Sequence, residues 1–309
     1  MTLPTFNQAI MVLGPTASGK TKLAVQIANI YQAEIISADS RQVYQELNIG
    51  SGKDLKEYTL GTKSIIYHLI DICNLKAEFT LSDYVKASNR VIDEMSQRLV
   101  TPVICGGSGL YLETFLKEFE FAGLSVSKDL RKELERKSAD ELRSEIKQLH
   151  YLQSQPDINQ LSKLRLIRLY ESLTYDSNEL IQSRALNPII IGIHPSTEIR
   201  WQRIQNRLEQ RFKEGMIDEV EQLMNDGVSS ERLQRLGLEY KYISKYLMNE
   251  LSLDEMKTIL FFEIRRFSKR QMTYFRKLEK DGHSIFWIDG NLSSQNQFEQ
   301  VMNFLTDKK

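Results

Sequence analysis

The stretch that decides the fold reads Gly14-Pro15-Thr16-Ala17-Ser18-Gly19-Lys20-Thr21. It matches the pattern G-x-x-x-x-G-K-[ST], in which backbone N–H groups and a helix N-terminus point at phosphate oxygens. An apolar run at residues 9–13 precedes it and a helix-period stretch at residues 20–31 follows it, so the loop lies between a strand and a helix. The pattern predicts a phosphate-binding loop, in which Lys20 adds a positive charge and Thr21 holds Mg²⁺ through its hydroxyl.

Further apolar runs of strand length follow along the chain. They occupy residues 34–38, 65–70, 102–105 and 188–193, with a possible last run at 284–288. Helical patterns, such as the one at residues 81–99, lie between them. Alternating strands and helices imply a parallel sheet with helices on both faces. The expected fold class is α/β, with a P-loop NTPase-like parallel sheet flanked by helices.

A change of pattern divides the chain. From about residue 117 to residue 186 the strand signals vanish, and residues 128–149 are charged and have apolar residues at near-helical spacing. The later helical patterns cover 198–214, 217–225, 240–248 and 253–278. We expect the first part of the α/β core in residues 1–116 and a helical insertion in residues 117–186. Residues 187–309 would hold the return of the core and a helical C-terminal part.

The charge balance is even, with 41 lysines and arginines against 41 aspartates and glutamates. No global field therefore draws the chain onto nucleic acid, and any such contact depends on local patches. The two cysteines, Cys73 and Cys105, form no CxxC pair, which argues against a zinc site or a disulfide scaffold and favours a reduced, cytoplasmic setting. The apolar run at residues 9–13 is too short to span a membrane, so no membrane association is expected.

A carboxylate follows the second predicted strand. Asp39 comes directly after the run at residues 34–38, at the edge where open α/β sheets bind ligands. There it would face the phosphate loop. The residues alone leave two other roles open for it. Asp39 could cap a helix or form an Asx turn, and in a kinase either Asp39 or Asp71 could hold Mg²⁺.

Several motifs occur in a fixed order along the chain. After the phosphate loop come DSRQVY at residues 39–44, Ile49-Gly50, HLID at 68–71, GGSGLY at 106–111 and KRQ at 269–271. Each of the later motifs is weak alone, but their order and spacing together carry information. Together they resemble the bacterial type of the tRNA dimethylallyltransferases, which are also named tRNA isopentenylpyrophosphate transferases. The resemblance covers almost the whole chain.

The resemblance implies transfer of the dimethylallyl group of dimethylallyl diphosphate to the N6 amine of the adenosine immediately 3′ of the anticodon in tRNA. Asp39 matches the general base on that amine. Lys20 and Arg207 would act on the departing diphosphate with Mg²⁺, so no ATP would be consumed although such loops also bind ATP. The implied diphosphate ligands are Gly14, Pro15, Thr16, Ala17, Ser18, Gly19, Lys20, Thr21 and Arg207.

A second group of residues matches the family's tRNA contacts. The members are Asp39, Ser40, Arg41, Gln42, Ser108, Arg131, Arg165, Arg168, Lys269, Arg270 and Gln271. The last three lie in a stretch between Glu263 and Glu279 that has six basic residues and no acidic one, interleaved with aromatic residues. This composition suits phosphate contact and base stacking. An amphipathic helix with a solvated basic face is the alternative.

The chain departs from the family pattern in three places. Relatives usually read G-Y-R where this chain has Gly237-Leu238-Glu239, and Arg211 matches no arginine in several relatives, so we assign it no role. The His-Pro-Asn-Asp stretch that commonly precedes the helix of Arg165 is also absent from the sequence. The altered Gly237-Leu238-Glu239 region and the missing stretch leave the predicted catalytic centre untouched and bear on tRNA selectivity.

Other function classes remain as alternatives. One is a small-molecule P-loop enzyme, either a kinase or an isopentenyltransferase acting on free adenine nucleotide, which would need neither the helical insertion nor the basic C-terminal helix. Another is a non-catalytic RNA-binding module, which would not need Lys20, Thr21 and Asp39 together. For the leading hypothesis we expect tRNA and dimethylallyl diphosphate as partners and a monomeric protein.

Overall fold

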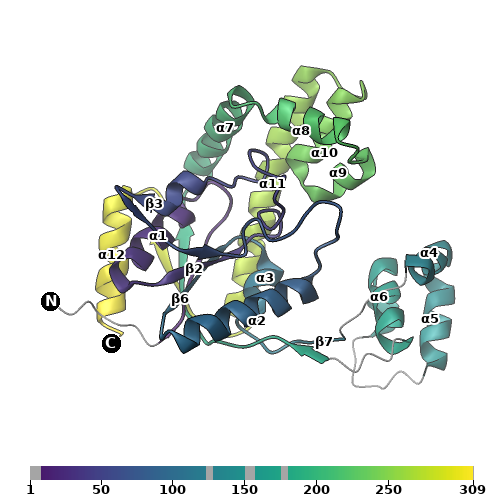
Figure 1. Ribbon diagram of the computed structural model, residues 1–309, viewed down its shortest axis with the longest axis horizontal. Helices are drawn as coiled ribbons and strands as arrows, with labels where there is room; N and C mark the ends of the chain where they lie inside the picture. The colour runs from purple at the N-terminus through teal and green to yellow at the C-terminus, as the bar shows by residue number, and fades with distance from the viewer. Residues whose placement is uncertain (1–7, 123–127, 150–156, 175–179, 309) are drawn as a thin grey trace. The chain divides into compact units, whose positions relative to one another are not determined.

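The computed structural model describes residues 8–122, 128–149, 157–174 and 180–308 (Figure 1). The chain divides into two compact units, of which the first combines Met1–Lys117 with Arg184–Lys309 and the second is Glu118–Ser183. The predicted insertion at residues 117–186 and the second unit therefore cover nearly the same stretch of sequence. Each unit is described by itself below.

A six-stranded parallel sheet forms the centre of the first unit, with strand order β10-β9-β1-β6-β2-β5. Its strands are β1 Ile10–Leu13, β2 Glu34–Ala38, β5 Tyr67–His68, β6 Pro102–Gly106, β9 Ile189–His194 and β10 Ile285–Asp289. The predicted α/β class is confirmed, including the last strand. The run at residues 65–70 yields a strand of only two residues, because Leu69 and Asp71 have φ values of 63° and 58°, outside the extended region.

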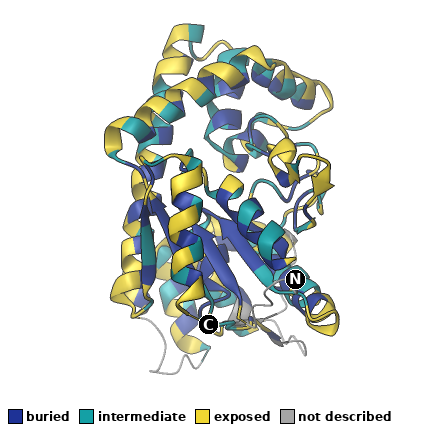
Figure 2. Cartoon of the chain, turned by 90° about the vertical axis from the view of Figure 1, so that its left-hand side faces the viewer, coloured by how far each residue is buried: buried dark blue, intermediate teal, exposed yellow. Residues whose placement is uncertain are grey.

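Helices cover both faces of the sheet. In Figure 2 the buried strands, drawn in dark blue, lie between helices whose exposed sides are drawn in yellow. Along β1, Ile10 and Val12 pack in one apolar cluster while Met11 and Leu13 pack in the other, because successive side chains of a strand point to opposite faces. The first cluster includes α1 Lys20–Tyr31 and α12 Ser294–Thr306. The second includes α2 Leu81–Gln97 and α3 Gly109–Glu113.

The remaining helices of the first unit lie in the C-terminal part of the chain. They are α7 Thr197–Lys213, α8 Met216–Asn225, α9 Ser230–Leu236, α10 Leu238–Leu247 and α11 Leu253–Lys280. The sequence pattern did not predict α9, which is seven residues long. The 28-residue α11 begins at a capping box in which Ser252 and Glu255 bond each other's backbone N–H groups. A short excursion between β2 and β5 contains η1 Leu55–Tyr58 and the hairpin of β3 Thr59–Leu60 with β4 Lys63–Ser64.

The second unit is a small helical body. Its elements are β7 Glu120–Ala122, α4 Lys128–Arg136, α5 Ala139–Gln148, η2 Ile158–Gln160, α6 Lys163–Thr174 and β8 Leu180–Gln182. The helical character predicted for residues 128–149 is confirmed, and it is divided between α4 and α5 because Ser138 caps α5 through a capping box with Glu141. The absence of strands predicted for 117–186 is wrong. β7 and β8 pair as an antiparallel ribbon, but three residues are too few to give a periodic signal.

A membrane-spanning segment is not found among the described helices, none of which is both long and apolar enough.

Candidate active site

The phosphate loop bends between β1 and α1 in the way that its glycines permit. Ala17 and Gly19 have φ values of 61° and 90°, and α1 starts at the next residue. A Cβ at Gly14 would lie 2.5 Å from the Ser18 Oγ, so a larger residue there would displace the loop. Ser18 N donates to Pro15 O at 3.2 Å, which closes the turn. Gly14, Pro15 and Ser18 thus shape the loop.

Gln271 of α11 holds this loop in place. Its Oε1 accepts from the backbone N of Thr16 at 2.8 Å, and its Nε2 donates to the carbonyl of Gly107 at 2.9 Å. A Cβ at Gly107 would lie 2.4 Å from that nitrogen, so the glycine makes room for the amide. Gln271 is 7% exposed, and its side chain therefore joins the loop after β1 to the loop after β6.

A cavity of about 290 Å³ opens beside the loop, and we name it the phosphate-loop cavity. Its lining includes ten of the charged or hydroxyl-bearing side chains of the region: Thr16, Lys20, Thr21, Asp39, Arg41, Asp54, Glu57, Arg203, Arg207 and Glu239. Arg211 and the backbone of the loop at Gly19 complete the polar wall. The cavity therefore combines an anion-binding loop with carboxylates in one enclosure.

Positive charge gathers at the inner end of the cavity. Arg207 of α7 donates to the Thr16 hydroxyl, so its guanidinium lies against the loop. Burial and then the neighbouring Arg211 lower the pKa of Arg207. Burial also lowers the pKa of Lys20, although the Cys105 thiol and the Asp39 carboxylate oppose that effect. Cations crowded out of water in this way are stabilised by an anionic ligand.

Asp39 lies where β2 ends, as the sequence predicts. Its Oδ1 accepts from the backbone N of Arg41 at 3.0 Å, so the Asx turn also forms, and Oδ2 takes no part in that turn. Ser108 fixes the next residue, since its Oγ accepts from Ser40 N at 3.2 Å and its own N donates to Ala38 O at 3.2 Å. The Asx turn thus orients the Asp39 carboxylate, and Ser108 of the loop after β6 holds the backbone on either side of Asp39.

The loop that contains Gly52 and Asp54, which the sequence did not predict as part of the site, forms another wall of the phosphate-loop cavity. Gly52 has a φ of 72°, and a Cβ there would lie 2.3 Å from Arg211 Nη2, so only glycine admits this guanidinium. Arg211 is 5% exposed, and the carboxylate of Asp54 lies 3.8 Å from it. Within the described residues, Arg211 Nη2 and Glu239 Oε2 are both buried without a hydrogen-bond partner. Partial burial and the nearby Asp54 raise the pKa of Glu57.

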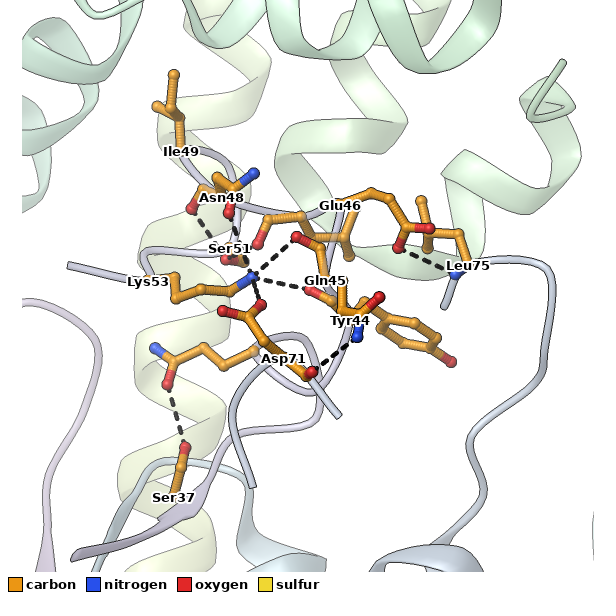
Figure 3. A network of polar contacts seen from close by, with 12 residues as sticks. Ser37, Tyr44, Gln45, Glu46, Asn48, Ile49, Ser51, Lys53, Asp71 and Leu75 are labelled. Atoms are coloured by element: carbon orange, nitrogen blue, oxygen red, sulfur yellow. Dashed lines mark hydrogen bonds and ion pairs between the residues drawn. The ribbon is translucent and has the colours of Figure 1, made fainter. Parts of the chain in front are cut away.

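The loop is anchored by a buried lysine, whose contacts we name the Lys53 network (Figure 3). The Lys53 side chain is completely buried and donates to Tyr44 O at 2.8 Å and to Asn48 Oδ1 at 3.3 Å. It also forms an ion pair with Asp71. The Asp71 carboxylate therefore stabilises the fold. It is not among the described residues that line the phosphate-loop cavity, so it is not placed to hold Mg²⁺ there as in a kinase.

Comparison with known proteins identifies the family. A family model described as IPP transferase matches residues 42–278. The chain is 38% identical over 302 residues to "tRNA dimethylallyltransferase 1" of Parabacteroides distasonis, covering 97% of this chain and 98% of that protein. It is 40% identical over 298 residues to "tRNA dimethylallyltransferase 1" of Azobacteroides pseudotrichonymphae, covering 96% and 97%. The chain belongs to the IPP transferase family.

Solved structures agree with membership of the IPP transferases. The full-length tRNA isopentenylpyrophosphate transferase of Bacillus halodurans matches with a TM-score of 0.71 and 28% identity, over 98% of this chain and 97% of that one. A eukaryotic dimethylallyltransferase described as acting on tRNA shares the fold, with a TM-score of 0.76 at 18% identity over 98% and 80% of the two chains. The chain is thus a transferase, and the kinase alternative is not favoured.

The structure of this IPP transferase brings many of the predicted site residues together. Those that line the phosphate-loop cavity are Thr16, Ala17, Gly19, Lys20, Thr21, Asp39, Arg41, Gln42, Arg207 and Gln271. Ser40 and Ser108 lie beside it, whereas Lys269 and Arg270 are exposed on α11. In the second unit, Arg165 and Arg168 are exposed on α6, and Arg131 binds the buried Glu171 at 2.8 Å.

Five charged residues of the cavity lining were missed as site residues: Asp54, Glu57, Arg203, Arg211 and Glu239. Arg203, Arg207 and Arg211 recur every fourth residue and share one helix face, which was the available signal. Asp54 and Glu57 carried no signal, because they lie in an irregular excursion whose path depends on the Lys53 network. Glu239 stood out only as a departure from the family pattern.

Proposed function

We propose that this IPP transferase moves the dimethylallyl group of dimethylallyl diphosphate to the N6 amine of the adenosine immediately 3′ of the anticodon in tRNA, releasing diphosphate. The observation that carries the proposal is the joint presence of Lys20, Arg207 and Asp39 in one cavity. A kinase could use such a carboxylate on a hydroxyl or for Mg²⁺, so the acceptor is chosen with the help of the relatives. The relatives named above are tRNA-modifying enzymes, which supports the choice of acceptor.

The chemistry requires charge stabilisation at one end of the cavity and proton removal at the other. Departure of diphosphate from the allylic carbon builds negative charge, which Lys20, Arg207 and the backbone N–H groups of the loop would stabilise. The exocyclic amine of adenine is a poor nucleophile because its lone pair is delocalised into the ring. Asp39, held by its Asx turn, would take the proton from this amine as the C–N bond forms.

Mg²⁺ fits the donor set of the cavity. The Thr21 hydroxyl and the Glu57 carboxylate line the same cavity, and oxygen atoms are the ligands that Mg²⁺ prefers. No group of three or more histidine, cysteine, aspartate or glutamate side chains that could hold a metal occurs among the described residues. Thr21 would therefore hold Mg²⁺ together with diphosphate oxygens and water, as is usual for this ion. When bound, Mg²⁺ would neutralise charge on the leaving group.

Contacts to tRNA are proposed for three parts of the chain. Ser40, Arg41 and Gln42 follow Asp39, and Arg41 lies 5.1 Å from the centre of the Phe267 ring. Lys269 and Arg270 are exposed cations on α11, available to RNA phosphates. In the second unit the exposed residues Arg165 and Arg168 offer a further phosphate-binding surface. For Gln271 and Arg131, whose side chains bond within the chain, any contact with tRNA would be secondary to these bonds.

The test is incubation with radiolabelled dimethylallyl diphosphate and either total tRNA or free AMP, with and without Mg²⁺ and with no ATP. We expect label to pass to tRNA only when Mg²⁺ is present. Label on AMP instead would favour an isopentenyltransferase acting on free nucleotide. A requirement for ATP hydrolysis would contradict the proposal, because the phosphate loop would then act in phosphoryl transfer.

A further inference from the structure

A second cavity, of about 440 Å³, lies between α7 and α11, and we name it the basic cavity. Ile264, Phe267 and Gln271 of α11 line the phosphate-loop cavity, whereas Arg265, Lys269, Met272 and Arg276 line the basic cavity. These two sets occupy different faces of the helix, because successive residues turn by about 100°. The basic cavity is therefore separate from the proposed catalytic site.

The basic cavity concentrates positive charge. Its cationic lining residues are Arg200, Arg265, Arg266, Lys269 and Arg276, and no described lining residue carries a carboxylate. Of the carboxylates nearby, Glu263 pairs with Arg266 at 2.5 Å and Glu198 partly offsets the charge of Arg200. Burial and then Arg276 lower the pKa of Arg200. Burial and then Arg200 lower the pKa of His194, and the Asp289 carboxylate opposes that effect.

One of these cations is built into the wall. Arg200 is 7% exposed, and within the described residues its Nε is buried without a hydrogen-bond partner. A buried guanidinium N–H that lacks an acceptor carries a free-energy cost, which is larger because the group is charged. An anionic oxygen of a ligand in the cavity could accept a hydrogen bond from this N–H and would remove that cost.

Aromatic rings stand beside these charges. Arg265 Cζ lies 3.4 Å from the centre of the Trp201 ring, within stacking distance. Trp201 and Phe262 are 36% and 50% exposed, although both line the same cavity. A simple anion would gain nothing from exposed rings, whereas cations interleaved with aromatic side chains bind a phosphate and stack a base.

We propose that the basic cavity binds a nucleotide unit, with the phosphate on the cations around Arg200 and the base against Trp201 and Phe262. The proposal rests on the proposed function for its expected source, an unpaired stretch of the RNA substrate. A free nucleotide presents the same chemistry. The two sources differ in the neighbouring phosphates, which only an RNA strand would place on Lys269 and Arg276.

Tryptophan fluorescence offers a direct test, because Trp201 and Trp287 are the two tryptophans of the chain. In a Trp287→Phe protein the emission reports on Trp201 alone. The full-length protein would first be saturated with inorganic pyrophosphate to fill the phosphate-loop cavity. It would then be titrated with a short single-stranded RNA and, in a separate arm, with AMP.

We expect saturable quenching of Trp201 by the RNA or by AMP, with affinity lowered about 10-fold in Arg265→Ala, as for loss of one charged hydrogen bond to the phosphate. Arg265→Lys should keep part of that affinity, and Lys280→Ala, an exposed change on the same helix, should keep all of it. Quenching by RNA alone would identify the strand as the source, and equal quenching by AMP would identify the single nucleotide. Melting temperatures of the variants would show that they remain folded.

Two results would overturn the proposal: no saturable change of Trp201 emission with either ligand, or equal affinities in the wild type and in Arg265→Ala. Extra pyrophosphate that displaced the nucleotide would also overturn it, because the cavity would then select only an anion. Prenyl transfer to tRNA is measured separately on the wild type. Transfer without nucleotide binding would remove this inference alone, and binding without transfer would remove the proposed function alone.

Discussion

The phosphate-loop cavity and the Lys53 network both contain buried charged side chains, but they differ in how these side chains are hydrogen-bonded. In the network, Lys53 is completely buried and bonds to Asp71 and to several oxygens of the loop around it. In the cavity, Arg211 Nη2 and Glu239 Oε2 are buried without hydrogen-bond partners in the described structure. Asp54 lies 3.8 Å from Arg211 Nη2 but does not hydrogen-bond to it. A buried charge that lacks hydrogen bonds lowers stability, whereas a fully bonded charge fixes one conformation. Buried charges without hydrogen bonds are therefore candidates for ligand binding, whereas fully hydrogen-bonded buried charges stabilise one conformation of the fold.

Asp39 and Asp71 show the same contrast between two carboxylates. Both come after strands of the same parallel sheet, β2 and β5, and both lie near its carboxyl edge. Lys53 takes the carboxylate of Asp71, while Asp39 lines the cavity with one oxygen outside its turn. A position after a strand therefore does not distinguish a reactive carboxylate from a structural one. The partner provided by the tertiary structure does.

The largest effect is expected for Asp39→Asn. The amide keeps the shape and the Asx turn but accepts no proton, so the single-turnover rate at saturating tRNA should fall about 10²- to 10⁴-fold. Donor affinity and melting temperature should stay near wild type. A near-normal rate would remove the base assignment, and a loss restored by excess Mg²⁺ would make Asp39 a metal ligand instead.

Asp71→Asn should act on stability and spare the chemistry. It leaves the buried Lys53 ammonium without its counter-charge, so the free energy of unfolding should fall by roughly 1–3 kcal/mol in a urea titration. The single-turnover rate of the folded fraction should change far less than in Asp39→Asn.

A paired variant sharpens that prediction. Lys53→Met combined with Asp71→Asn removes the buried charge as well as its partner, so it should be more stable than Asp71→Asn alone. If the double variant were less stable than the single one, the ammonium would not be the source of the cost.

Arg211→Met should weaken ligand binding without lowering the stability of the unliganded protein. Arg211 lines the phosphate-loop cavity and its Nη2 has no hydrogen-bond partner among the described residues, so we expect it to donate to the diphosphate. Loss of that bond should weaken pyrophosphate binding about 10-fold in calorimetry. The melting temperature should stay level or rise, because the change removes a buried charge that repels Arg207. Arg211→Lys serves as the control that keeps the charge. Unchanged affinity in Arg211→Met would show that Arg211 does not meet the diphosphate.

The smallest effect is expected for exposed charges on α11. Lys269→Ala with Arg270→Ala should raise the KM for tRNA a few-fold and make the salt dependence shallower, by a slope of about 1 for each RNA phosphate that the variant no longer binds. Donor affinity should not change. Lys280→Ala, also exposed on α11, is the matched control. Identical tRNA affinity for the double variant and the control at every salt concentration would argue against phosphate binding by these two residues.

The sequence by itself determined the α/β class and the phosphate loop, because both depend on local pattern. Five apolar runs and a possible sixth match the six strands, and Gly14 to Thr21 fix the loop through backbone chemistry alone. The motif order also pointed to the family and to Asp39. In contrast, the sequence did not predict that the strand in residues 65–70 is only two residues long or that residues 128–149 form two helices. Positive φ angles and a capping box, which act over single residues, decide both features.

Only the tertiary structure decided which charges meet. Gln271 lies 255 residues from Thr16 along the chain and nevertheless bonds its backbone N–H. Asp54, Glu57 and Glu239 enter the phosphate-loop cavity from an irregular loop and the start of a short helix, where no periodicity predicts direction. The physical reason is that burial and pairing depend on segments distant in sequence, whereas propensity and spacing report only on neighbours.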